Sequence, residues 1–341
     1  MKSVARWVVL AAVCAVGIRF GLLPLMAQEN SDDMLPAVLE GTRQAAAAIK
    51  SGAGHVTVTK QSVYANGGVH ETEAIYDLVF SGDKYKTKAT ARTIRNDPDG
   101  KPLSPNQVLT PVGHQSVSES SFDGTRVIKY YLESKNAKLW DKDDSGGRAE
   151  LVEYGIYLAP SNHCGIVGLG QGVCDLAAFF DSLLRKGRKE IKEINAKITG
   201  RQVVDGVDCI VVEWGFEVTE GSENGTRWVY NFWVSPDRGY TLTQCKEWRV
   251  KPQSEERELA VDVQSETVCN GGVWVPRRYS ETQYDLDRGG GTAPGISSLC
   301  VTTYDEDFAW NKAVSSDDLT LVLPSGTQVH DFALDALYTI P

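Results

Sequence analysis

The chain has 341 residues, with 45 Asp and Glu against 35 Lys and Arg, a formal net charge of −10 and a sequence pI near 5.1. Apolar residues make up 42% of the chain, enough for a folded core, so the composition excludes a disordered protein. The excess of acidic residues argues against nucleic acid, which is bound through Lys and Arg at the phosphates, and against electrostatic docking on anionic lipid.

The start of the chain has the features of a signal peptide. Lys2 and Arg6 precede an apolar run at residues 7–18. Arg19 interrupts this run before it reaches the roughly 18 to 20 residues that a membrane span needs, which favours cleavage over a retained anchor. Residues 1–27 are therefore predicted to be a signal peptide that is removed on export.

The mature chain, residues 28–341, shows no linker and no internal repeat of fixed period, so we expect a single domain. The predicted export places it in the periplasm or cell envelope. A lipid-attached Cys14 is a minor alternative, because Val13 stands where a lipid-attachment signal has a small residue.

Six cysteines remain in the mature chain, an even number that indicates disulfides in an oxidising compartment. Cys164 and Cys174 are close in sequence, and we predict a disulfide between them. The other four cannot be paired from the sequence: Cys209, Cys245, Cys269 and Cys300. His163, beside Cys164, raises a metal site as the alternative, but no further ligands at metal-binding spacing accompany it, and no metal is predicted.

Two segments are predicted to be helices. Residues 32–50 place apolar side chains at helical spacing, with Asp32 or Asp33 as the cap. Residues 174–186 end in basic side chains, as suits a helix C-terminus. The apolar stripe of this second helix is Leu176, Phe179, Phe180, Leu183 and Leu184.

Most of the remaining sequence alternates between apolar and polar residues with a period of two. Strands are predicted within residues 55–94 and 116–133, with a loop at 95–115 that is rich in Asp, Pro and Asn. Further strands are predicted at 150–158 and within 191–307, whereas the polar residues 134–148 are expected to be a surface excursion. The hairpin turns have Asn-Gly or Asp-Gly at 66–67, 205–206, 224–225 and 270–271. This pattern predicts a mainly β domain with about eleven or twelve antiparallel strands and two helices.

No set of residues in the sequence indicates catalysis. There is no Gly-x-Ser-x-Gly segment, and the five histidines lie in unrelated turns and strands, so no catalytic residue and no cofactor are predicted. The Gly-rich residues 165–172 resemble a dinucleotide fingerprint only superficially, because their neighbours are antiparallel strands. They are interpreted as a loop, closed by the predicted disulfide, that could act as a lid.

Aromatic residues on alternating strand positions are the more informative feature. They predict either an ordinary core under a curved sheet or the lining of a hydrophobic cavity between sheet and helices. The side chains proposed to line such a cavity are Tyr76, Phe80, Trp214, Phe216, Trp228, Tyr230 and Phe232. On residues 227–234 the choice of inward face stays open, since Val229, Asn231 and Trp233 form an alternative set.

Four segments and their order along the chain resemble the outer-membrane lipoprotein-sorting superfamily, which includes LolA-like and LolB-like lipoprotein carriers. The segments are VDGVD at 204–208, FWVSPDRGY at 232–240, GVWVPRR at 272–278 and LPSGTQVHD at 323–331. The resemblance covers roughly residues 32–340. It implies an α+β fold that is mainly β: a single large, bent antiparallel sheet of about eleven strands, forming an unclosed half-barrel covered by an N-terminal helix and an inserted helix.

The same resemblance implies binding without chemistry. The expected function is that of an exported, non-enzymatic protein that holds acyl chains of a lipid or an acylated lipoprotein in a hydrophobic cavity. The alternative is an envelope sensor or regulatory protein that uses the same fold to bind a protein partner. Neither function involves nucleic acid.

Overall fold

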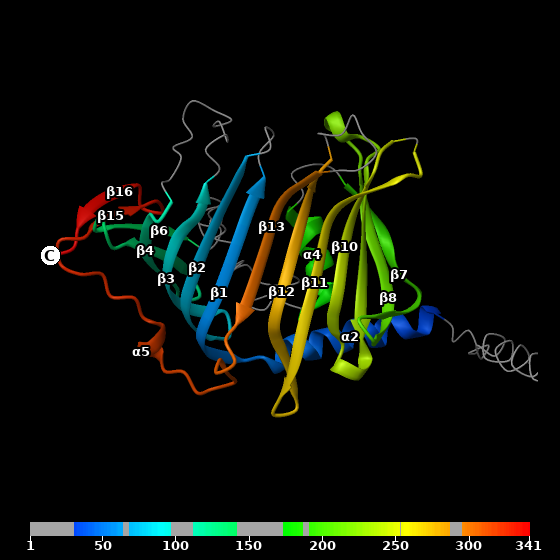
Figure 1. The fold of residues 1–341 in the computed structure, drawn as a ribbon, viewed down its shortest axis with the longest axis horizontal. Coiled ribbons are helices and arrows are strands. Elements are labelled where there is room, and N and C mark those ends of the chain that lie inside the picture. Colours follow the sequence, from blue (N-terminus) through cyan, green and yellow to red (C-terminus); the bar gives the residue numbers. More distant parts are fainter. Residues whose placement is uncertain are drawn as a thin grey trace, which may run out of the picture.

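A computed structural model describes residues 31–63, 68–96, 112–141, 173–186, 191–252, 254–286 and 295–341. Within these ranges sixteen strands form one sheet, accompanied by three α-helices (Figure 1). The helices are α2 (Ser31–Ala48), α4 (Leu176–Lys186) and the short α5 (Ser316–Leu319). The predicted signal peptide lies outside the described residues.

The strands fall into three groups along the chain. The first group is β1 (Ser51–Val63), β2 (Val69–Ser81), β3 (Lys84–Asn96), β4 (Gln115–Phe122), β5 (Arg126–Tyr131) and β6 (Asn136–Asp141). The second is β7 (Ile191–Val204), β8 (Val207–Val218), β9 (Arg227–Ser235), β10 (Thr241–Val250), β11 (Arg257–Asn270), β12 (Val273–Asp285) and β13 (Gly295–Tyr304). The third is β14 (Ala309–Trp310), β15 (Gln328–Asp331) and β16 (Ala336–Thr339).

The sheet is large and unclosed. Its strand order is β16-β15-β6-β5-β4-β3-β2-β1-β13-β12-β11-β10-β9-β8-β7, and β14 pairs with β1. The chain builds outward from β1 to β6, begins again at the far edge with β7, and returns until β13 pairs with β1. Every pairing is antiparallel except that of β15 with β6, which is parallel.

The predicted strands through 191–307 are confirmed as β7 to β13, and their turns follow from residue type. Between β7 and β8, Asp205 and Gly206 both have positive φ, 49° and 77°. Positive φ at both central positions defines the type I′ turn, whose twist matches that of the flanking strands. Asp-Gly therefore sets the register of this hairpin.

The two predicted helices are confirmed as α2 and α4, and both lie against the same side of the sheet (Figure 1). Near its start α2 packs Val38 against side chains of β8 to β11, and near its end it packs Ala45 and Ala46 against the apolar cluster to which β1 to β3 contribute. In between, Gly41 leaves room for the Tyr240 ring, which a Cβ at this position would contact too closely. The helix α2 thus spans two apolar clusters of one sheet.

The expectation that residues 134–148 form a surface excursion is wrong for the first part of that segment. Residues 136–141 form β6, which lies between β5 and β15, and Leu139 and Trp140 are buried there. The partner strand β15 comes from the far end of the chain, so local composition gave no sign of it. The short strands β14, β15 and β16 were also not predicted, whereas the strand expected at 150–158 lies outside the described residues.

No helix in the described ranges is both long enough and apolar enough to cross a membrane.

Candidate functional site

The register of β8 and β9 brings the aromatic side chains of both strands onto one face. Trp214 lies opposite Tyr230, and Phe216 lies opposite Trp228. Phe232 lies opposite Val212 and belongs to the same buried cluster. Directly opposed residues of an antiparallel pair point to the same face, so the inward set on β9 is Trp228, Tyr230 and Phe232.

The helix α4 covers this face with two further rings. Phe180 stacks on Trp214, with ring centroids 4.6 Å apart and an interplanar angle of 7°. Phe179 makes edge contacts with Tyr230 and Phe232, each at 5.9 Å between centroids. We define the aromatic cluster as Phe179, Phe180, Trp214, Phe216, Tyr230 and Phe232. Trp214 and Phe232 are fully buried within it.

The start of α4 is fixed by polar contacts. The Ala178 N–H donates to Asp175 Oδ1 at 3.1 Å, so Asp175 caps the helix. The Leu176 N–H donates to Thr42 Oγ1 of α2 at 3.4 Å, and Leu176 itself is fully buried. Helix α4 is therefore held at its first turn by α2 and along its apolar stripe by the sheet.

Two members of the aromatic cluster have polar partners at its margin. The Trp214 Nε1–H donates to Glu193 Oε1 at 3.0 Å, and the Tyr230 hydroxyl donates to Glu247 Oε1 at 2.9 Å. Burial raises the pKa of Glu247 above its ordinary value, and the nearby carboxylate of Glu281 raises it further although the Tyr230 hydrogen bond lowers it. A polar margin therefore adjoins an otherwise apolar cluster.

The seven proposed lining residues fall into two groups. Five of them, Trp214, Phe216, Trp228, Tyr230 and Phe232, gather under α4. Tyr76 and Phe80 instead lie in the second apolar cluster, to which β1 to β6, β12 and β13 contribute. Whether either group lines a cavity is not tested by this packing, and the lining role stays a prediction.

Sequence reasoning placed Phe179 and Phe180 on the apolar stripe of a helix but gave them no role in the site. Both rings nevertheless contact the sheet aromatics directly. Two adjacent Phe residues on a short amphipathic helix, beside a sheet rich in aromatics, were the signal that could have identified them. Their position makes α4 the covering element of the candidate site.

The predicted Cys164–Cys174 disulfide lies partly outside the described residues. Cys174 is buried just before α4, whereas Cys164 and the Gly-rich residues 165–172 lie outside the described residues. The pairing therefore stays a prediction. The remaining cysteines form no disulfide with one another: Cys209, Cys245, Cys269 and Cys300.

No protein-family model matches the chain, and no curated protein matches its sequence. Among solved structures, the fold is similar to that of a DUF1329 family protein from Desulfovibrio piger, with 12% identity, a TM-score of 0.41, and coverage of 84% of this chain and 99% of that one. It is also similar to a putative outer membrane lipoprotein-sorting protein domain from Vibrio parahaemolyticus, with 10% identity, a TM-score of 0.38, and coverage of 83% and 95%.

A LolA superfamily protein from Nitrosomonas europaea is similar at the same level, with 10% identity, a TM-score of 0.38, and coverage of 84% of this chain and 97% of that one. The resemblance expected from the sequence is thus found among solved structures. At these identities the likeness concerns the fold alone.

Proposed function

We propose that this protein binds the acyl chain of a lipid or of an acylated lipoprotein, without catalysing a reaction. The acyl chain would occupy the space that Phe179 and Phe180 of α4 fill, against the aromatic side chains of β8 and β9. The observation that carries the proposal is that a short helix supplies the rings that complete an aromatic cluster on one face of the sheet.

Helix α4 is suited to being displaced. It has 11 residues, and isolated helices shorter than about 12 to 15 residues are marginal in water, so α4 depends on its packing. Withdrawing both Phe rings gives up about 1.5–3 kcal/mol for each ring. An acyl chain gains about 0.8 kcal/mol for each CH₂ that it buries, so about four to eight CH₂ groups offset the loss of both rings. A longer chain buries more CH₂ groups, and this additional favourable free energy offsets the cost of association.

In this proposal the predicted signal peptide delivers the protein to the periplasm or cell envelope, where acylated lipoproteins and lipids are its binding partners. The half-barrel holds the chain on the face that carries α2 and α4. Tyr230 and Glu247 at the margin of the aromatic cluster meet the polar end of the ligand, since their hydrogen bond lies beside the apolar rings.

The test is titration of the chain from residue 28, purified and stripped of lipid, with a dansyl-labelled undecanoic acid. Saturable binding is expected, and a polar substitution such as Tyr230→Gln should weaken it. Phe180→Ala should strengthen binding at least tenfold, because this variant has one ring fewer to displace.

The matched control is Phe332→Ala, which removes a ring that stacks on Trp140, outside the aromatic cluster. Its affinity for the probe should equal that of the wild type. If neither the wild type nor Phe180→Ala binds the probe, acyl binding is excluded. Capture of a lipid-free protein with a protein partner would then favour the sensor function.

A further inference from the structure

The two edges of the sheet differ in character. The strand order ends in β16 on one side and in β7 on the other, and these two strands lie at opposite ends of the sheet (Figure 1). Among the described residues, no strand pairs with the free side of either one. Free edges are templates for pairing with another chain, and proteins protect them with charged side chains and β-bulges. The protection of each edge therefore indicates whether it is open to a further strand.

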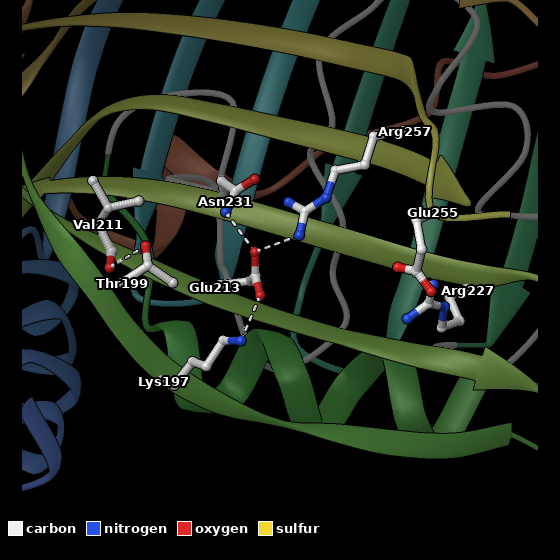
Figure 2. Close-up of polar contacts among 8 residues, drawn as sticks. All are labelled: Lys197, Thr199, Val211, Glu213, Arg227, Asn231, Glu255 and Arg257. Atoms are coloured by element: carbon white, nitrogen blue, oxygen red, sulfur yellow. Dashed lines mark hydrogen bonds and ion pairs between the residues drawn. The ribbon is translucent and has the colours of Figure 1, made fainter.

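Edge strand β7 is well protected. Four of its 14 residues are charged, and its pairing with β8 shifts register at two places, as β-bulges do. Lys197 lies 3.0 Å from the Glu213 carboxylate, and the Thr199 hydroxyl donates to the Val211 carbonyl oxygen at 3.4 Å (Figure 2). A strand that is irregular and charged in this way is a poor template for a further strand.

Edge strand β16 lacks both kinds of protection. It consists of Ala336, Leu337, Tyr338 and Thr339, none of which is charged, and its register with β15 is regular throughout. Leu337 is 76% exposed and Tyr338 is 40% exposed, on opposite faces of the sheet. An exposed and uncharged edge of this kind is suited to pairing, and only its length of four residues limits the area of contact.

The hairpin of β15 and β16 holds this edge in place. Val329 of β15 is fully buried, and it pairs with Tyr338 across the hairpin. In the turn, Asp331 Oδ1 accepts hydrogen bonds from the N–H groups of Ala333 and Leu334, both at 3.1 Å. Because the edge is already ordered, pairing with a further strand costs little conformational entropy.

The hydrogen bonds of the hairpin determine which backbone groups of β16 point outward. The Ile340 N–H donates to the carbonyl oxygen of Thr327 at 2.9 Å, so the backbone groups of Ile340 are directed to the β15 side. The backbone groups of successive residues in a strand point in opposite directions. Those of Tyr338 are therefore also directed to β15, whereas the N–H and C=O groups of Leu337 and Thr339 are directed away from it. The outward groups lie symmetrically on either side of Tyr338.

We propose that β16 pairs in antiparallel orientation with β16 of a second copy of this protein, across a two-fold axis at Tyr338. Leu337 then lies opposite Thr339 of the partner subunit, and Thr339 lies opposite Leu337 of the partner subunit. The two outward N–H groups of each copy donate to the two outward C=O groups of the other, so all of them are satisfied. Tyr338 faces its own copy in a non-hydrogen-bonded pair, where opposed side chains approach most closely.

Symmetry favours a second copy over an unrelated chain. The outward groups are arranged symmetrically about Tyr338, as a two-fold axis requires, and no charge within β16 repels the same strand of the other copy. Each chain is acidic overall, with a net charge of −10, and an interface of one short strand is small. The dimer is therefore expected to be weak and to gain affinity as salt screens the charges.

The chain from residue 28 is studied by sedimentation velocity at concentrations from about 2 to 200 µM, and a monomer–dimer equilibrium is expected within this range. Leu337→Lys, which puts a charge on the edge, should raise the dissociation constant at least tenfold. Val203→Lys is the matched control, because Val203 is 70% exposed on the opposite edge strand β7, and this variant should dimerise like the wild type. Leu337→Lys should still bind the dansyl fatty acid like the wild type, since β16 lies at the opposite end of the strand order from β8 and β9.

Cross-linking tests the register of the dimer. In a background that lacks the exposed thiol of Cys269 (Cys269→Ser), Tyr338→Cys should form an intermolecular disulfide on mild oxidation, because the two copies of this residue face each other at the axis. Thr339→Cys should cross-link much less, since it faces Leu337 of the partner subunit. A protein that stays monomeric at about 200 µM overturns the proposal, even if it captures an extended peptide of another protein. So does a dimer that Leu337→Lys leaves intact, or cross-linking that is equal at both positions.

Discussion

Tyr230 connects two different environments through a single side chain. Its ring lies 5.6 Å from Trp214 and 6.0 Å from Phe232 between centroids, within the aromatic cluster. Its hydroxyl donates to Glu247, so the phenol satisfies a carboxyl group that the fold has largely withdrawn from water. Burial of the phenol and the nearby Glu247 raise the pKa of Tyr230, which keeps it a donor at all physiological pH values.

The raised pKa of Glu247 predicts a pH-dependent effect on stability. The unfolded chain loses the Glu247 proton near the ordinary pKa of 4.5, whereas the folded chain retains it to higher pH. The contribution of Glu247 to stability is therefore fully present below pH 4.5 and is lost as the pH rises through the folded pKa. Glu247→Gln, whose amide oxygen still accepts from Tyr230, should gain stability relative to the wild type as the pH rises.

The measurement is the urea midpoint of both proteins from pH 4 to pH 8. The stability of Glu247→Gln relative to the wild type should be lowest at pH 4 and should increase with rising pH. An equal difference at every pH would contradict a raised pKa at Glu247. Comparing the two proteins removes the contribution of the other titrating groups, which both share.

Elements with strong local periodicity could be predicted from the sequence, and elements fixed by distant partners could not. The hairpins of β7 to β13 follow from alternation and turn residues, and α2 and α4 follow from helical spacing. By contrast, β6 has Lys138 and Asp141 within six residues, and its burial depends on β15 of the C-terminal segment. The face of β9 was undecided because both of its residue sets contain Trp, and only the pairing with β8 selects one.

The dependence of β6 on its distant partner strand gives a prediction for β15. Val329 is fully buried against Leu139 and Leu321, whereas Val322 on the same segment is 78% exposed. Val329→Ala should therefore cost about 1–3 kcal/mol in the free energy of unfolding, and the matched change Val322→Ala less than about 0.5 kcal/mol. Urea unfolding of the two variants measures both values. Equal values would mean that β15 does not hold β6 in place.

At the scale of the whole molecule, one helix and one strand pair join the two apolar clusters. Helix α2 contributes Val38 to one cluster and packs Ala45 and Ala46 against the other. The paired strands β11 and β12 contribute Val263 to the first cluster and Val275 to the second. We therefore expect residues 28–341 to unfold as a single cooperative unit.

The test is hydrogen exchange of Val58→Ala, which removes buried methyl groups from β1. Amides of β8 and β9, in the other cluster, should lose protection as much as those of β2, by about tenfold for each 1.4 kcal/mol of destabilisation. If exchange quickens only in β1 to β3, the two halves unfold separately and the single-domain prediction fails.

The pairing of β1 with β13 also determines the order in which the protein can be completed. Val56 pairs with Tyr304, so the central strands of the sheet come from opposite ends of the folded chain. In a chain that emerges N-terminus first from a ribosome or a secretion pore, β1 and β2 are present long before β13. During that interval one hydrogen-bonding edge of β1 has no partner, and such an edge is a template for aggregation. Correct folding therefore requires that this edge stay shielded until nearly the whole chain has emerged.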